Sequence, residues 1–308
     1  EAPVFPTLPA DLPVGQGRTE PCMAGVQGEV RCGRFRVWEN RETRTGRTVD
    51  VAFVVVKALQ DRGHRDAITI FNGGPGAPAT PIARGVARAA FREDRDILLI
   101  DHRGTGGSAP LACDNPYPRG VPSRFETVFP LDHVDGCREM LSRRADLSQY
   151  TTPNAMDDLA ELAAWLGYTG LNLNGGSYGT REAQIFARRH PAMVRTVVLN
   201  GVAPVDELLY VQHAKELQRA LDDMIDDCAS QEACRKAYPN LSGVLAEVLA
   251  TARDNPATVR VEGATVRFGI GPLSYALRGL LYGRSGSVPA RLHEAQAGNW
   301  QPLAEYYI

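Results

Sequence analysis

The chain has 308 residues, of which 44% are hydrophobic and 23% are charged, so a packed core is expected and a disordered chain is not. This length suits one large α/β domain or two smaller domains. A formal net charge of -2 gives no basis for nucleic-acid binding or for electrostatic attachment to a membrane. No apolar run approaches the roughly 18 residues that a membrane-spanning helix needs.

The N-terminus and the cysteines indicate an extracytoplasmic protein. The proline-rich start, EAPVFPTLPADLP, lacks the basic and apolar regions of a signal peptide, so we interpret it as a mature N-terminus after signal-peptide removal. Six cysteines form three pairs of near neighbours along the chain: Cys22 and Cys32, Cys113 and Cys137, Cys228 and Cys234. Neighbour pairing is the simplest of the possible disulfide patterns, and it predicts a secreted or periplasmic protein, which we expect to be bacterial. The alternative is buried free thiols in a cytosolic enzyme.

No metal site or cofactor is expected. The sequence has no Cys-x-x-Cys motif, and no histidine completes a zinc-like cluster with the cysteines.

The first part of the chain predicts a sheet. Residues 1–21 are expected to form an extended lead-in, and the β-rich stretches 28–40 and 47–59 predict an antiparallel pair. Short apolar runs at 67–71 and 96–101 both end in glycine-rich turns, which is typical of central strands in a parallel sheet. Between them, residues 80–91 have the spacing of a helix.

The next elements alternate between helix and strand. Residues 152–166 predict a helix with Asn154 as its N-cap and Gly167 as its stop signal. Strands are expected at 171–175 and 194–201, with a helix at 178–190 between them. This alternation predicts a doubly wound, mostly parallel α/β sheet.

The composition of the sequence changes after Gly201. Residues 206–308 are rich in helix formers, and we expect them to form a helical cap inserted after the sixth strand. The predicted organisation is therefore an α/β core over residues 1–205 followed by a cap over residues 206–308.

A candidate nucleophile lies in the stretch LNGGSYGT, where Ser177 occupies a Gly-x-Ser-x-Gly pattern between Gly175 and Gly179. A strand is predicted before it and a helix after it, which is the context of a nucleophile elbow. The flanking glycines leave room for the sharp turn, and the helix N-terminus points at developing negative charge. The alternative interpretation is a plain glycine-rich loop.

An oxyanion hole is predicted from two segments. The stretch NGGPG, residues 72–76, directly follows an apolar strand, and its glycines allow backbone amides to face a reaction centre. We expect the Gly74 amide and the Tyr178 amide to stabilise the oxyanion. The alternative for the first segment is a simple Gly-Pro turn.

A third motif, DHRGTGGS at residues 101–108, follows the strand at 96–101. We expect Asp101 and Arg103 to form a buried ion pair that fixes this loop beside the site. His102 is not favoured as the general base, because in an elbow-type hydrolase the base follows the nucleophile in the chain.

These three motifs, in this order and spacing, resemble the α/β-hydrolase serine peptidases of the proline iminopeptidase and tripeptidyl aminopeptidase group. That family usually shows His-Gly-Gly-Pro-Gly, Asp-Gln-Arg-Gly-x-Gly-x-Ser and Gly-x-Ser-Tyr-Gly. This chain departs from the pattern at Asn72, which replaces the usual His, and at His102, which replaces the usual Gln. The resemblance implies an α/β-hydrolase fold and an exopeptidase activity.

The triad Asp and His are not expected in this chain. A hydrolase of this family takes its catalytic acid and its catalytic histidine from segments after the cap. This sequence ends at PLAEYYI, in a segment that still resembles the predicted cap. His213 and His293, the histidines that follow the elbow region, both fall in predicted cap helices. We therefore expect the last strands of the sheet to be absent, and a C-terminal remainder of the same enzyme to supply Asp and His. An isolated chain would expose an apolar sheet edge and is expected to be inactive and poorly soluble.

The predicted function is a secreted serine exopeptidase of the aminopeptidase or tripeptidyl aminopeptidase type, acting on peptides through an acyl-enzyme on Ser177. Acidic residues near the start of the cap could bind the substrate's α-ammonium group, although a solvated helix face is the more common role: Asp206, Glu207, Asp222, Asp223, Asp226 and Asp227. The alternatives are a carboxylic-ester hydrolase with the same elbow and a non-catalytic binding protein that retains the scaffold.

Overall fold

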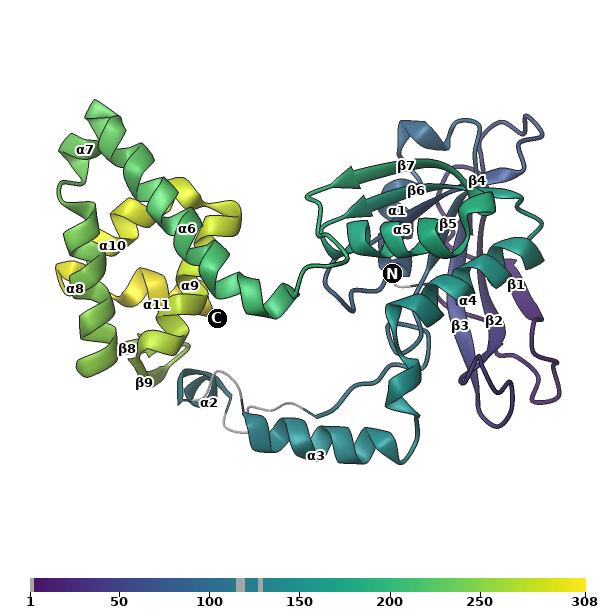
Figure 1. Ribbon diagram of the computed structural model, residues 1–308, viewed down its shortest axis with the longest axis horizontal. Helices are drawn as coiled ribbons and strands as arrows, with labels where there is room; N and C mark the ends of the chain where they lie inside the picture. Colours follow the sequence, from purple (N-terminus) through teal and green to yellow (C-terminus); the bar gives the residue numbers. More distant parts are fainter. Residues whose placement is uncertain (1–2, 115–119, 127–129) are drawn as a thin grey trace. The chain divides into compact units, whose positions relative to one another are not determined.

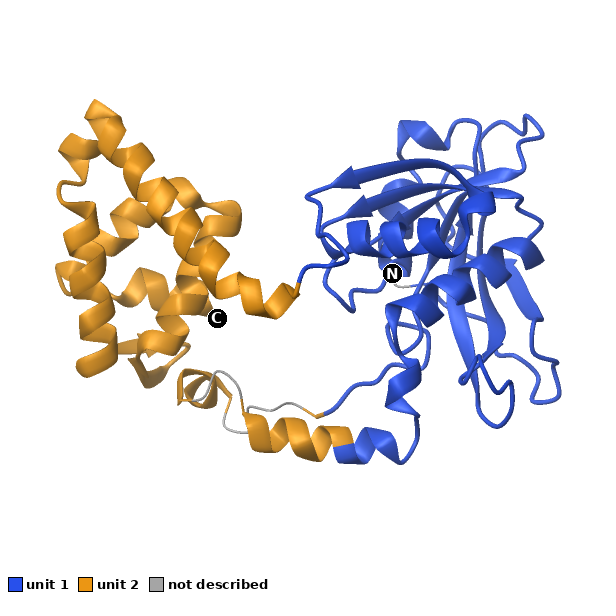
Figure 2. Cartoon of the chain, viewed as in Figure 1, with its two compact units in different colours: residues 1–113, 139–207 blue, residues 114–138, 208–308 orange. Residues whose placement is uncertain are grey.

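The computed structural model describes residues 3–114, 120–126 and 130–308 (Figure 1). The first two residues of the expected mature N-terminus lie outside these ranges. The chain divides into two compact units, shown in different colours in Figure 2. Unit 1 comprises residues 1–113 and 139–207, and unit 2 comprises residues 114–138 and 208–308.

Unit 1 is built on a seven-stranded sheet with the order β1-β2-β3-β5-β4-β6-β7. β3 runs antiparallel to β2 and β5, whereas β5, β4, β6 and β7 are mutually parallel. The strands are β1 (Gly17–Pro21), β2 (Val30–Trp38), β3 (Thr48–Val56), β4 (Asp66–Phe71), β5 (Ile97–Ile100), β6 (Gly170–Gly176) and β7 (Val194–Asn200). All six strands expected from the sequence are confirmed. β1 forms within the segment expected to be a lead-in, so the sheet has seven strands before residue 206.

Helices cover both faces of this sheet, because its strands are apolar on both sides. Along β3, Phe53 packs in one core with Met156 and Phe186, whereas Val54 packs in the other with Ala83. The helices of unit 1 are α1 (Ala83–Val86), α4 (Thr152–Trp165) and α5 (Tyr178–Arg189), with 3₁₀ turns η1 (Thr80–Ile82), η2 (Ala90–Arg92), η3 (Leu147–Gln149) and η4 (Pro191–Met193). α4 and α5 lie on the first face and α1 on the second (Figure 1).

Two local predictions in unit 1 are wrong. The helix expected over 80–91 is reduced to α1 between 3₁₀ turns, because the backbone becomes extended at Ala89 and the buried Arg92 side chain donates to the Ala87 carbonyl. The N-cap of α4 is Thr151, whose hydroxyl accepts from the Asn154 amide. Asn154 instead donates its side-chain amide to the backbone of the preceding turn. The predicted stop at Gly167 is confirmed by its φ of +87°.

Unit 2 is mainly helical around its own hydrophobic core. Its elements are α2 (Val121–Glu126), α3 (Leu131–Ser142, which extends past residue 138), α6 (Leu209–Ser230), α7 (Glu232–Ala237), α8 (Leu241–Asp254), β8 (Ala257–Val261), β9 (Ala264–Phe268), α9 (Ile270–Gly283), η5 (Ser285–Ser287), α10 (Val288–Gln296) and α11 (Gln301–Tyr307). The core includes Val248, Phe268 and Leu292, and Phe125 of α2 packs its ring 6.0 Å from that of Phe268. The antiparallel hairpin β8–β9 was not expected from the helix-rich composition.

The disulfide prediction is confirmed at two pairs, Cys22–Cys32 and Cys228–Cys234. Cys113 and Cys137 are also disulfide-bonded. In the described part of the chain, no helix is long and apolar enough to cross a membrane.

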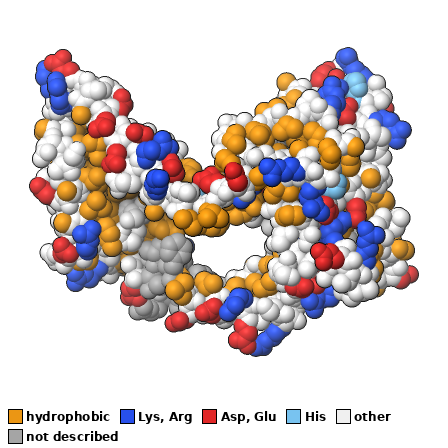
Figure 3. Space-filling model, in the orientation of Figure 1, with side chains coloured by type: hydrophobic (Ala, Val, Ile, Leu, Met, Phe, Trp, Pro, Cys, Tyr) orange, Lys and Arg blue, Asp and Glu red, His pale blue; other side chains and the backbone are white. Residues whose placement is uncertain are grey.

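β7 is an edge strand within the described residues, since it pairs with β6 alone. Val197 and Val198 on this strand are 42% and 57% exposed. Figure 3 shows hydrophobic side chains gathered over the part of unit 1 where β6 and β7 lie. These side chains make the β7 edge of the sheet apolar, and the expectation that further strands complete the sheet stays a prediction.

Candidate active site

Ser177 occupies a sharp turn between β6 and α5. Its backbone has φ 53° and ψ -124°, a strained conformation for a residue with a side chain, and the residue is exposed. Such strain is typical of a nucleophile elbow, where the turn lifts the side chain above the sheet. Because α5 begins at the next residue, the Tyr178 amide has no acceptor within the helix.

The glycines on either side of Ser177 are required by close backbone packing. A Cβ atom on Gly175 would lie 2.4 Å from the Gly179 carbonyl oxygen, and one on Gly179 would lie 2.3 Å from the carbonyl oxygen of Phe71. The first turn of α5 therefore rests directly on the end of β6 and on the end of β4. The Gly-x-Ser-x-Gly pattern is thus explained by the approach of three backbone segments.

Hydrogen bonds tie the same turn to the end of β7. The Ser177 amide donates to the Asn200 carbonyl at 2.9 Å, and the Thr180 hydroxyl donates to the Ser177 carbonyl at 2.7 Å. The Thr180 hydroxyl also accepts from the Ala203 amide at 2.8 Å. Sequence reasoning missed Thr180, although its place three residues after the serine was a signal, because a threonine there can bond back to the turn.

The glycine loop after β4 lies beside Ser177. A Cβ atom on Gly73 would stand 3.6 Å from Ser177 Oγ, so the backbone at this position is next to the hydroxyl. The Asn72 side chain closes the loop by donating to the Pro78 carbonyl at 3.0 Å and accepting from the Gly73 amide. Gly74 has φ +130°, a conformation that favours glycine. The loop is therefore placed to supply an oxyanion donor, and the amides of Gly74 and Tyr178 stay our predicted donors.

The expected Asp101–Arg103 ion pair is wrong. Asp101 accepts hydrogen bonds from the amide and hydroxyl of Thr80 and from the Gly107 amide. Arg103 instead binds both carboxylate oxygens of Asp158 on α4, each at 2.7 Å. The Asp101 carboxylate is held by its own loop and by η1, so the arginine pairs with a helix that comes later in the chain.

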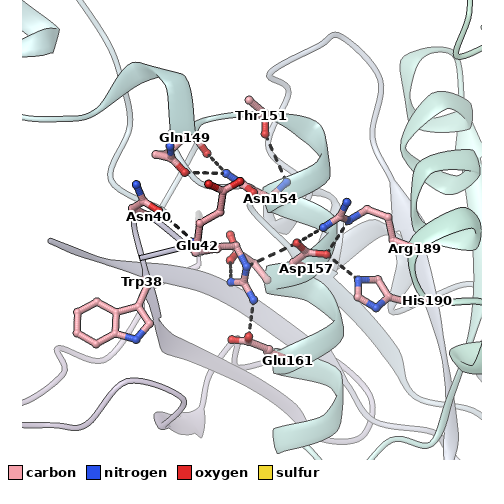
Figure 4. A network of polar contacts seen from close by, with 12 residues as sticks. Trp38, Asn40, Glu42, Gln149, Thr151, Asn154, Asp157, Glu161, Arg189 and His190 are labelled. Carbon is pink, nitrogen blue, oxygen red and sulfur yellow. Dashed lines mark hydrogen bonds and ion pairs between the residues drawn. The ribbon is translucent and has the colours of Figure 1, made fainter. Parts of the chain in front are cut away.

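The Arg103–Asp158 pair belongs to a larger ionic network on α4. Arg41 also binds Asp158, at 2.6 Å, and forms an ion pair with Glu161. Asp157, the residue before Asp158, accepts from Arg189 and from the ring of His190 (Figure 4). Burial acts to raise the pKa of Asp157, but the hydrogen bonds from Arg189 and His190 outweigh it and hold the pKa below its ordinary value. This network fixes α4 and the end of α5 to the sheet.

His102 lies in the loop after β5 and contacts Glu182 of α5. Its Nδ1 atom is 3.2 Å from Glu182 Oε1. Burial acts to lower the pKa of His102, but the nearby Glu182 carboxylate outweighs it, so the pKa is raised above its ordinary value. Sequence reasoning did not predict this contact, because Glu182 lies 80 residues later in the sequence.

In the described part of the chain, the hydrogen bonds of Ser177 involve its backbone amide and carbonyl. The location of the triad Asp and His outside this chain stays a prediction. His213 is exposed on α6, and the ring of His293 on α10 packs 5.6 Å from that of Tyr238. Of the suggested ammonium-binding carboxylates, those on α6 are all exposed: Asp222, Asp223, Asp226 and Asp227. The described residues also contain no group of side chains suited to hold a metal ion.

Fold and site together define a class of protein. A mostly parallel sheet with a serine on a strained strand-to-helix turn, beside a glycine loop from the neighbouring strand, is the arrangement of the α/β hydrolases. The family model described as alpha/beta hydrolase fold matches residues 66–250. The chain belongs to this family.

Several curated relatives of this chain are peptidases or proteases by name. It is 27% identical over 238 residues to the tripeptidyl aminopeptidase of Streptomyces coelicolor, covering 71% of this chain and 44% of that protein. It is 27% identical over 229 residues to the serine protease Hip1 of Mycobacterium tuberculosis, covering 68% and 43%. The chain thus spans less than half the length of these relatives.

Solved structures with a similar arrangement include the proline iminopeptidase of Mycobacterium smegmatis. It has 15% sequence identity and a TM-score of 0.38, and the alignment covers 82% of this chain and 66% of that one.

Proposed function

We propose that this chain is the nucleophile-bearing part of a serine exopeptidase that cleaves peptides from a free N-terminus. Ser177 Oγ bonds to the peptide carbonyl carbon, its proton passes to a base, and the amine leaves with a proton. Water then hydrolyses the acyl-enzyme. The amides of Gly74 and Tyr178 stabilise the oxyanion in both steps.

One observation carries this proposal, namely the backbone of Ser177. A non-glycine residue at φ 53° and ψ -124° stores strain that only the surrounding packing maintains. Here that packing consists of Gly175 and Gly179 against neighbouring backbone, and it presents an exposed hydroxyl next to Gly73. The names of the curated relatives support a peptide as substrate.

We further propose that a C-terminal remainder of the same enzyme supplies the triad Asp and His. The partial coverage of the relatives supports this, since the match covers 44% of the tripeptidyl aminopeptidase. Disulfides in both units support an extracytoplasmic location.

The test begins with a fluorophosphonate probe on the native protein. Ser177 Oγ should displace fluoride from phosphorus, so that intact mass rises by one adduct and peptide mapping places it on Ser177. Ser177→Ala should abolish the adduct and the turnover. A native protein that takes up no probe would contradict the proposal and favour the non-catalytic scaffold.

Substrate comparison then defines the activity. An exopeptidase should hydrolyse peptide amides with a free N-terminus much faster than their N-acylated counterparts. Equal rates on both, together with faster hydrolysis of p-nitrophenyl esters, would identify a carboxylic-ester hydrolase instead.

A further inference from the structure

His102 and Glu182 form a polar pair next to the nucleophile turn, and no step of the proposed reaction uses it. His102 follows β5 directly, and Glu182 lies on α5, five residues after Ser177. The carboxyl ends of the parallel strands β4, β5 and β6 meet at one edge of the sheet, so the His102 loop, the glycine loop and Ser177 share that edge. The His102 ring also lies 6.4 Å from the ring of Phe71, the last residue of β4.

The Glu182 carboxylate needs a cationic partner because it is buried. Its side chain is 4% exposed, and its Oε2 atom is buried without a hydrogen-bond partner among the described residues. A buried carboxylate loses its hydration and destabilises the fold unless a positive charge or hydrogen bonds replace the water. The His102 ring, 19% exposed, is the group that the structure places against it.

The other acidic groups near His102 are already paired. Asp158 on α4 is bound by two guanidinium groups, and Asp101, in the same loop as His102, accepts hydrogen bonds from Thr80 and Gly107. Glu182 is therefore the carboxylate that sets the charge on His102. The raised pKa of His102 agrees with a ring that stays protonated where a free histidine becomes neutral.

We propose that His102 and Glu182 are positioning residues for the nucleophile: the imidazolium, fixed in the loop after β5, holds the buried carboxylate and thereby the N-terminal turns of α5 that set the position of Ser177. This rests on the proposed function only in that Ser177 is the nucleophile. The first turn of α5 already contacts β4 through Gly179 and Phe71, and the ion pair fixes the next turn to β5. Loss of the charge on His102 leaves a buried, uncompensated carboxylate one turn beyond the serine.

The test compares His102→Gln and Glu182→Gln with the double variant in the native full-length protein. His64→Gln is the matched control, because His64 is 3.5 Å from Asp94 but precedes β4, at the opposite edge of the sheet. Hydrogen–deuterium exchange should be faster over residues 173–182 in His102→Gln and unchanged there in the control. The double variant should recover much of the protection, because no lone buried charge remains.

The pH profile separates positioning from a general loss of stability. Displacing reacting groups by about 1 Å costs on the order of 10²-fold, so the fluorophosphonate should react ~10- to 100-fold more slowly with His102→Gln near pH 6. The ratio of wild-type to variant rates should fall as the pH rises through the pKa of His102. Imidazole NMR should give a lower pKa for His102 in Glu182→Gln.

Unchanged exchange over residues 173–182 in both single variants, or an unshifted His102 pKa in Glu182→Gln, would overturn the inference. A ratio of labelling rates that does not vary with pH would also overturn it. If the wild-type protein takes up no probe, the proposed function fails, while the exchange and NMR measurements still decide whether the pair holds α5.

Discussion

Arg103→Ala should destabilise unit 1 strongly, because it removes the central cation of a buried network. The Arg103 side chain is 1% exposed, and it binds Asp158, which is equally buried, through two hydrogen bonds of 2.7 Å. It also donates to the backbone carbonyls of Trp38, Glu39 and Gln149. The variant therefore removes one donor from each of these three carbonyls and leaves a buried carboxylate with Arg41 as its remaining partner.

Removing one partner of a buried ion pair costs about 3–5 kcal/mol. We expect Arg103→Ala to lower the free energy of unfolding by an amount in this range, since solvent does not screen the buried pair. Arg103→Lys should recover part of it, because an ammonium group cannot reproduce the bidentate geometry. The control is Arg18→Ala, which removes an ion pair with Glu20 whose side chains are 57% and 47% exposed, and which should cost less than about 1 kcal/mol.

Urea unfolding measures these differences. Trp38 and Trp165 report on unit 1, and a Trp300→Phe background removes the tryptophan of unit 2 from the signal. A loss below about 1 kcal/mol for Arg103→Ala, equal to that of the control, would refute the assignment of Arg103 as the central cation of this network.

Three further predictions concern packing, cross-linking and pH. Gly179→Ala should lower the free energy of unfolding by about 1–3 kcal/mol and slow the labelling of Ser177 about tenfold or more, because the new methyl group would overlap backbone atoms of β4. Gly176→Ala is the control and should have little effect, because nothing lies within 4 Å of its Cβ position. Equal effects of the two variants on unfolding and labelling would contradict this prediction. Replacing Cys22 and Cys32 by alanines should lower the free energy of unfolding by about 3 kcal/mol, the value expected for the short loop that this disulfide closes. An unchanged midpoint of urea unfolding would count against this prediction. Asp157→Asn should be less stable than the wild-type protein at pH values above the ordinary carboxyl pKa near 3.8. The difference in free energy of unfolding should shrink as the pH falls through the lower pKa that Asp157 has in the folded protein. A difference that is constant from pH 2 to pH 7 would argue against an ionised Asp157.

Local patterns in the sequence were enough to predict the central strands and the nucleophile. Runs such as 67–71 and 96–101 are apolar on both faces, so they can be stable only inside a sheet covered on both sides. Ser177 was identifiable because the sharp turn excludes a Cβ atom at Gly175 and Gly179, and this requirement is visible within five residues. The hairpin β8–β9 was missed because its short strands lie in a helix-rich segment.

The partners of the charged residues were decided by the tertiary structure. Asp101 and Arg103 are neighbours in sequence, and their pairing was a reasonable expectation, yet the arginine reaches Asp158, 55 residues away, and the aspartate binds its own loop. His102 likewise finds Glu182 only when the loop after β5 and helix α5 come together. The sequence by itself determined which residues can form the turn and the strands, because those requirements are local. Only the folded chain decided which buried charges meet, because each pairing depends on how distant elements pack.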